Sequence, residues 1–145
     1  MIGTRIYHSS QEAKTDATWV AVSFNSDLSD PNTVHSTATN SSRVIIGVGG
    51  TYAIAFHVSW TLETAAGVGT RGLRILKNSS VVATDKSYAA FPNTIHWTHS
   101  MSCIDRFSAG DIITAEVYQE NSDLLGAIRS VGWNTPHLTL VGPRH

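Results

Sequence analysis

The fold is decided by the stretch TYAIAFHVSWTL, residues 51–62. Large apolar side chains occupy every second position, and Ala, His and Ser lie between them. This period of two predicts a β-strand, because successive side chains of a strand point to opposite faces of a sheet. The stretch contains no Asp, Glu, Lys or Arg, so neither of its faces has the charges expected of a face in contact with water.

The same period recurs along the chain, and no segment places apolar residues at helical spacing between caps. Turn residues separate the segments: Asn78-Ser79-Ser80 predicts a hairpin turn, and Ser108-Ala109-Gly110 predicts a second connection. About nine strands with turns at this spacing are typical of a β-sandwich or barrel. The predicted strands cover residues 18–25, 51–62, 69–78, 81–88, 94–104, 111–119 and 135–141, with weaker candidates at 5–9 and 42–48.

Two long connections, residues 28–40 and 121–134, are rich in Asn, Ser, Asp and Gly. Long loops on a compact β domain are often contact surfaces. The candidate partner-contact residues are therefore His35 in the first connection and Trp133 in the second. For Trp133, contact with a partner and packing back onto the domain are both open, because strand alternation does not force its burial.

The composition limits the classes of protein to which the chain can belong. Its 145 residues and 15.6 kDa predict a single domain, residues 1–145, with a core that needs no disulfide. A net charge of −1 gives no basic surface for nucleic acid, and no apolar run is long enough for a membrane span. The single Cys103 can form neither an intrachain disulfide nor, alone, a zinc site.

Charged residues are distributed unevenly among the predicted strands. The ranges 51–62, 94–104 and 134–143 contain no Asp, Glu, Lys or Arg, whereas Arg71, Arg74 and Lys77 punctuate the strand at 69–78. A sandwich strand with one wet face normally alternates apolar with polar residues. Strands that lack charge on both faces therefore predict a sheet covered twice, once by the other sheet of its own sandwich and once by another copy of the chain.

Several segments, in order along nearly the whole chain, resemble the jelly roll of the C1q and tumour-necrosis-factor superfamily, in particular its bacterial and phage branch. The matching segments are residues 5–8 (RIYH), 19–24 (WVAVSF), 34–37 (VHST), 49–56 (GGTYAIAF), 107–111 (FSAGD), 116–117 (EV) and 136–140 (PHLTL). The resemblance implies an antiparallel jelly-roll β-sandwich of about nine to ten strands. It also implies a homotrimer in which one sheet of each protomer faces its neighbours around a threefold axis.

Within such a trimer we expect the subunit interface to use a set of residues from the charge-poor strands and the first strand. The set is Tyr7, Tyr52, Ala55, His57, His99, Leu138 and Leu140. Alternation alone does not say which face of a sheet is which, so some members of the set could instead belong to the core.

Catalytic and metal chemistry find little support in the sequence. His96 and His99, three residues apart on a strand, would point to opposite sides of the sheet, and no His-x-His pair followed by Glu occurs. A Gly-x-Ser-x-Gly elbow is absent, and Cys103 lies within a predicted strand, where a small core residue is the ordinary interpretation. We therefore expect no enzyme activity, no cofactor and no metal site.

The function predicted from these observations is that of a non-enzymatic virion structural protein, a trimeric phage capsid decoration protein. The first predicted strand lies close to the amino end, with no stalk or secretory leader before it, which favours this hypothesis. The expected partners are further copies of the chain and the major capsid protein or another virion protein, and the expected location is the capsid surface or otherwise extracellular. The alternatives are a receptor-binding or adhesion module at a fibre tip, which would contact a host-surface glycan or protein, and a C1q-like glycan-binding protein.

Overall fold

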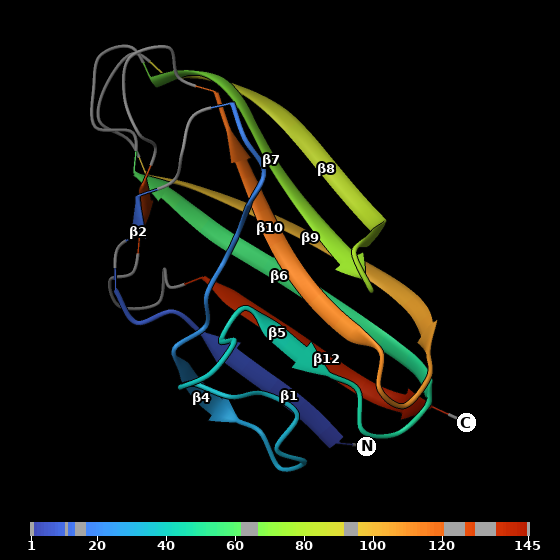
Figure 1. The fold of residues 1–145 in the computed structure, drawn as a ribbon. Coiled ribbons are helices and arrows are strands. Elements are labelled where there is room, and N and C mark those ends of the chain that lie inside the picture. Colours follow the sequence, from blue (N-terminus) through green and yellow to red (C-terminus); the bar gives the residue numbers. More distant parts are fainter. Residues whose placement is uncertain are drawn as a thin grey trace.

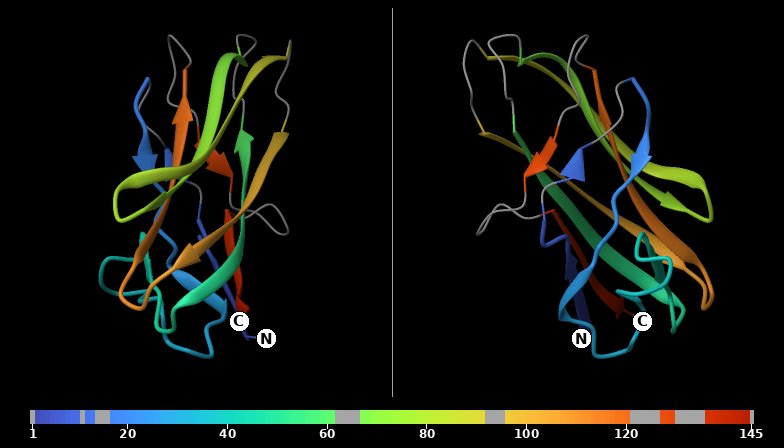
Figure 2. Two further views of the ribbon diagram at one scale, coloured as in Figure 1. Left: turned by 90° about the vertical axis from the view of Figure 1, so that its right-hand side faces the viewer. Right: turned by 60° about the vertical axis from the view of Figure 1, so that its left-hand side comes forward.

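Two antiparallel β-sheets pack against each other in the computed structural model of the protein (Figure 1 and Figure 2). The structure describes residues 2–10, 12–13, 17–61, 67–91, 96–120, 127–129 and 136–144, and these ranges contain no helix. The predicted all-β class is therefore confirmed. The strands are β1 (Ile2–Tyr7), β2 (Glu12–Ala13), β3 (Val20–Ala21), β4 (Ser26–Ser29), β5 (Arg43–Ile45), β6 (Gly50–Thr61), β7 (Gly67–Lys77), β8 (Ser80–Phe91), β9 (His96–Phe107), β10 (Ile112–Gln119), β11 (Ala127–Arg129) and β12 (His137–Arg144).

The centre of the larger sheet, which we call sheet A, is β6. It pairs with β9 along its whole length, from Gly50 opposite Phe107 to Thr61 opposite His96. Its other side pairs with β12 and, further along, with β11. β1 and β4 extend sheet A beyond β12, and β2 lies beside β11. The charge-poor segments of the sequence thus form three adjacent strands, β9, β6 and β12.

The smaller sheet, which we call sheet B, has the order β3-β10-β7-β8, and β5 also pairs with β10. Figure 1 shows β10 and β7 crossing in front of β6 and β9, so the two sheets form two layers. The beginning of β1 and the end of β12 lie at the same end of the sandwich in all views.

The core lies between the sheets and is built from the inward half of each alternating strand. From β6 it receives Tyr52, Ile54, Phe56, Val58 and Trp60, all buried. Sheet B contributes mainly branched aliphatic residues of β7 and β10, and the rings of Phe24 and Phe56 meet edge to face at 6.4 Å. Full burial of each large apolar side chain stabilises the fold by about 1.5–3 kcal/mol, so this alternation is the main source of stability.

Some predicted strands are shorter in the structure, and one strand was not predicted. The segment 18–25 keeps its alternation, but only Val20–Ala21 is a strand, because the chain then leaves β10 and the Phe24 amide donates to the Ser41 carbonyl at 2.9 Å. β4 pairs with β1 although its sequence Ser-Asp-Leu-Ser has no apolar alternation. Backbone pairing to an existing edge, which side-chain periodicity does not report, creates this strand.

Both predicted turns are confirmed, and one carboxylate ties them together. Asn78 and Ser79 have positive φ angles of 49° and 71°, as a two-residue hairpin with a right-handed twist requires. The Asp111 carboxylate accepts from the Ser108 amide at 2.8 Å and from the Asn78 side-chain amide at 2.7 Å, and Lys77 Nζ lies 3.6 Å away. The Ser108 N–H and then the Asn78 amide lower the pKa of Asp111.

We predict that Asp111→Asn reduces the free energy of unfolding at neutral pH and that its difference from the wild type shrinks in acid. A carboxyl whose pKa is lowered by folding stabilises the protein above its unfolded pKa, and this contribution is lost as the pH falls through the folded pKa. Urea unfolding at a series of pH values measures the effect, with Glu120→Gln on the exposed strand end as the control. If the variant and the wild type differed in free energy of unfolding by the same amount at neutral and acid pH, the lowered pKa of Asp111 would be contradicted.

Candidate functional site

The side of sheet A that points away from sheet B is uncharged over its middle. We call this surface the outer face of sheet A and define it by Ala53, Ala55, Ser102, Ile104, Thr139 and Val141. These residues lie in register on β6, β9 and β12 and line a shallow hollow of about 550 Å³. Ile104 is 74% exposed, and the small side chains of Ala53 and Ala55 are also exposed. An exposed apolar surface with a small-residue centre is typical of a contact surface.

A row of three rings continues this face across β1, β12 and β6. Tyr7 stacks on His137 with ring centroids 5.8 Å apart, and His137 stacks on His57 at 4.6 Å. His137 Nδ1 and His57 Nε2 are 3.1 Å apart and share a hydrogen bond. Arg5, two residues before Tyr7 and opposite Thr139, is exposed and gives this end of the face one positive charge.

Four of the seven predicted interface residues lie inside the sandwich instead of on this face. They are Tyr52, His99, Leu138 and Leu140, each less than a tenth exposed. Leu138 and Leu140 pack in the core, the Tyr52 hydroxyl donates to the Val48 carbonyl at 2.7 Å, and His99 Nε2 bonds Asp85 at 2.6 Å. The prediction selected the wrong face of these strands. Tyr7, Ala55 and His57 do lie on the outer side, and their role at an interface stays a prediction.

We predict that Leu138→Ala lowers the free energy of unfolding by about 2–5 kcal/mol, because it leaves a cavity in the core. The neighbouring Thr139→Ala, on the outer face, should lower the free energy of unfolding of a single chain much less. Chemical denaturation at several protein concentrations measures both variants. A cost for Leu138→Ala that disappears on dilution would place this side chain at a subunit interface after all.

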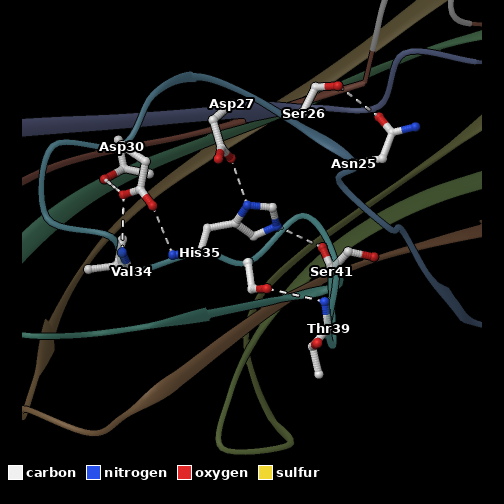
Figure 3. A network of polar contacts seen from close by, with 10 residues as sticks. Asn25, Ser26, Asp27, Asp30, Val34, His35, Thr39 and Ser41 are labelled. Atoms are coloured by element: carbon white, nitrogen blue, oxygen red, sulfur yellow. Dashed lines mark hydrogen bonds and ion pairs between the residues drawn. The ribbon is translucent and has the colours of Figure 1, made fainter.

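His35 is buried and serves as a structural residue, so its prediction as a partner-contact residue is wrong. Figure 3 shows its ring held between Asp27 and Ser41. Nδ1 lies 2.7 Å from the Asp27 carboxylate and Nε2 lies 2.9 Å from the Ser41 carbonyl. These two contacts fix the orientation of the buried ring.

Asp30 fixes the other half of the same loop (Figure 3). Its carboxylate accepts from the amides of Val34 and His35 at 3.2 and 3.0 Å, and the Thr4 hydroxyl of β1 donates to it at 3.2 Å. The segment from β4 to β5 therefore runs from the edge of sheet A to the edge of sheet B as an ordered strap. The role of this loop as a contact surface stays a prediction, and its outward residues are the neighbours of His35.

We predict that His35→Ala lowers the free energy of unfolding by about 1–3 kcal/mol, because it removes the buried ring that bonds to the Asp27 carboxylate and the Ser41 carbonyl. Thr37→Ala, at an exposed position of the same loop, is the matched control and should be nearly neutral. Urea denaturation of both variants provides the comparison. A neutral His35→Ala would show that the buried ring does not order the strap.

Three aromatic side chains of the strands, Trp60, Trp97 and Tyr118, pack within the domain. Trp60 is fully buried, Trp97 packs against the core, and Tyr118 lies 5.4 Å from Trp19. Tyr88 is 69% exposed on sheet B. Trp133 lies outside the described residues.

The charge of Arg71 is buried, whereas the sequence pattern places it with Arg74 and Lys77 on a face in contact with water. Its side chain is fully buried, donates to the Glu120 carbonyl at 3.0 Å and lies 5.5 Å from the centre of the Trp60 ring. A signal was present, because Arg71 has the same phase along the strand as Leu73 and Ile75, which point inward. Phase, and not charge alone, decides which side of the sheet a residue occupies.

The described residues contain no cluster of three or more His, Cys, Asp or Glu side chains able to hold a metal ion. They also form no helix with the length and apolar character needed to cross a bilayer. Cys103 packs against the core, and burial, followed by the charge of Asp105, raises the pKa of its thiol. A raised pKa leaves less thiolate, which is the nucleophilic form.

The architecture matches solved structures over nearly its whole length. The globular domain of zebrafish complement 1qA protein aligns with a TM-score of 0.64 at 15% identity, covering 97% of this chain and 96% of that one. Murine APRIL aligns with a TM-score of 0.68 at 12% identity in the structure at pH 8.0 and with 0.68 at 10% identity at pH 5.0, each covering 96% of this chain and 97% of that one. The fold is a C1q/TNF-like jelly roll.

The predicted antiparallel jelly-roll β-sandwich is thereby confirmed. No family model matches the chain, and no curated protein matches it in sequence. At identities this low the likeness concerns the fold, and function has to be argued from the surface.

Proposed function

We propose that the protein is a non-catalytic structural module that self-associates as a homotrimer through the outer face of sheet A. The observation that carries the proposal is the uncharged centre of this face, where exposed Ile104 lines the hollow together with Ala53 and Ala55. A second copy of the same chain would cover this surface without placing a charge against an apolar neighbour.

The proposed role of the trimer is to join other subunits by multivalent contact, as a decoration protein on the capsid of a phage. Three identical footprints bind together, so that weak individual contacts add through their effective concentration. The major capsid protein or another virion protein would be the partner, and the virion surface, or otherwise an extracellular site, would be the location. The ordered strap between β4 and β5 supports a role in binding, because ordered loops on a rigid scaffold often carry contact residues.

The second candidate is a receptor-binding or adhesion module at a fibre tip. Co-sedimentation with a panel of empty phage heads, in parallel with whole host cells, separates the two roles. Saturable binding to heads at a fixed ratio per capsomer supports decoration. Binding to host cells alone would reverse this ranking.

We predict that Ile104→Lys converts the assembled protein to a monomer of 15.6 kDa while the sandwich stays folded. The lysine would place a desolvated charge in the uncharged interface, which is strongly unfavourable, whereas in the single chain it stays in water. Sedimentation velocity measures the mass, and circular dichroism checks the fold. Tyr88→Lys, at an exposed position on sheet B, is the control and should keep the assembled mass. A wild-type protein that is already monomeric at micromolar concentration would contradict the trimer.

A further inference from the structure

A second hollow lies on the strap, around β5 and the loop before it. It has a volume of about 420 Å³, which is within the range of small-ligand sites. Its lining comes from residues 32–47, and its β5 members belong to sheet B, so it is separate from the outer face of sheet A. A ligand at this place does not require self-association.

Hydrogen bonds order the loop that lines this hollow. The Asp30 and His35 contacts described above fix the loop on the inner side, and the Ile45 amide donates to the Val34 carbonyl at 2.8 Å. On the outer side, the Arg43 amide donates to the Asn40 carbonyl at 3.0 Å. A loop ordered before binding loses little conformational entropy when a ligand arrives.

Two residues of the lining lie in the left-handed region of backbone conformation, which is disfavoured for the side chain of Thr33. Thr33 and Asn40 both have φ angles of 52°, in the left-handed region. For a β-branched residue such as Thr33 this conformation is a true outlier. Such strain persists where the surrounding structure enforces it, and it is found preferentially at binding sites.

The lining combines an apolar wall with amide and hydroxyl groups and one exposed cation. Val34 and the half-exposed Ile45 form the apolar wall, Asn32 and Asn40 bring amides, and Ser36 brings a hydroxyl. Arg43 is exposed, and among the described residues no carboxylate forms an ion pair with it. The residues that line the hollow include no Asp or Glu.

We propose that this hollow binds a carboxylated sugar, with the guanidinium of Arg43 on the sugar carboxylate. The amides and the hydroxyl would exchange hydrogen bonds with the sugar hydroxyls, and the C–H face of the ring would pack on Val34 and Ile45. A planar guanidinium pairs with a carboxylate through two parallel hydrogen bonds, which favours this class over neutral sugars. A uronic acid and a sialic acid share this chemistry, and the test separates them.

The test is a titration of the ¹⁵N-labelled full chain with galacturonic acid, N-acetylneuraminic acid and galactose, followed by amide chemical shifts. We expect saturable shifts at the amides of residues 32–47 with one or both acids, at about millimolar affinity for a single sugar ring. Binding of galacturonic acid alone would identify a uronic acid as the ligand, and binding of N-acetylneuraminic acid alone would identify a sialic acid. Galactose should bind at least about tenfold more weakly.

Two variants provide the matched comparison. Arg43→Gln should lose about tenfold or more of the affinity for the acid, and Arg43→Lys should keep part of it. Arg5→Gln removes an exposed arginine from sheet A and should bind like the wild type. The monomeric Ile104→Lys chain should also bind, so failure of the trimer and failure of this site are distinguishable.

Three results would each overturn the proposal. The first is the absence of saturable shifts in residues 32–47 with either acid. The second is equal affinity for galactose and galacturonic acid, and the third is unchanged affinity in Arg43→Gln with an intact fold.

Discussion

Antiparallel pairing of β6 with β9 on one side and with β12 on the other fixes the orientation of every side chain in the middle of sheet A. One half of β6 points between the sheets and forms the core, and the other half points outward. A shift of register by a single residue would exchange these two sets. The apolar core, the uncharged outer face and the position of His57 beside His137 all follow from this one register.

The strap from β4 to β5 depends on that framework at both of its ends. β4 pairs with β1 of sheet A, and β5 pairs with β10 of sheet B, so the strap closes one side of the sandwich. Polar groups inside the strap find hydrogen-bond partners within it. The Asp30 carboxylate accepts from backbone amides, and the His35 ring bonds to Asp27 and to Ser41. Its outward side is thereby free to vary in chemistry without loss of the fold, which is why contact residues are found so often on such loops.

The sequence predicted those parts of the structure that follow from periodicity. The alternation in β6, β7, β9 and β10, the hairpin at Asn78 and the gathering of charge-poor strands in one sheet all have a local signal. Periodicity separates two faces but does not say which one is inside, and for that reason Leu138 and His99 were assigned to the wrong side. β4 and the buried role of His35 depend on partners distant in sequence, on β1 and at Asp27 and Ser41, and leave no local pattern.

The central claim is that sister copies cover the outer face of sheet A, and the solvent access of its two alanine methyl groups tests this most directly. Ala53, Ala55 and the turn residue Ala109 are all exposed in a single chain. In methyl-labelled protein at a concentration that favours assembly, a water-soluble paramagnetic probe should broaden Ala109 strongly and leave Ala53 and Ala55 sharp. Equal broadening of all three methyl groups would contradict the account.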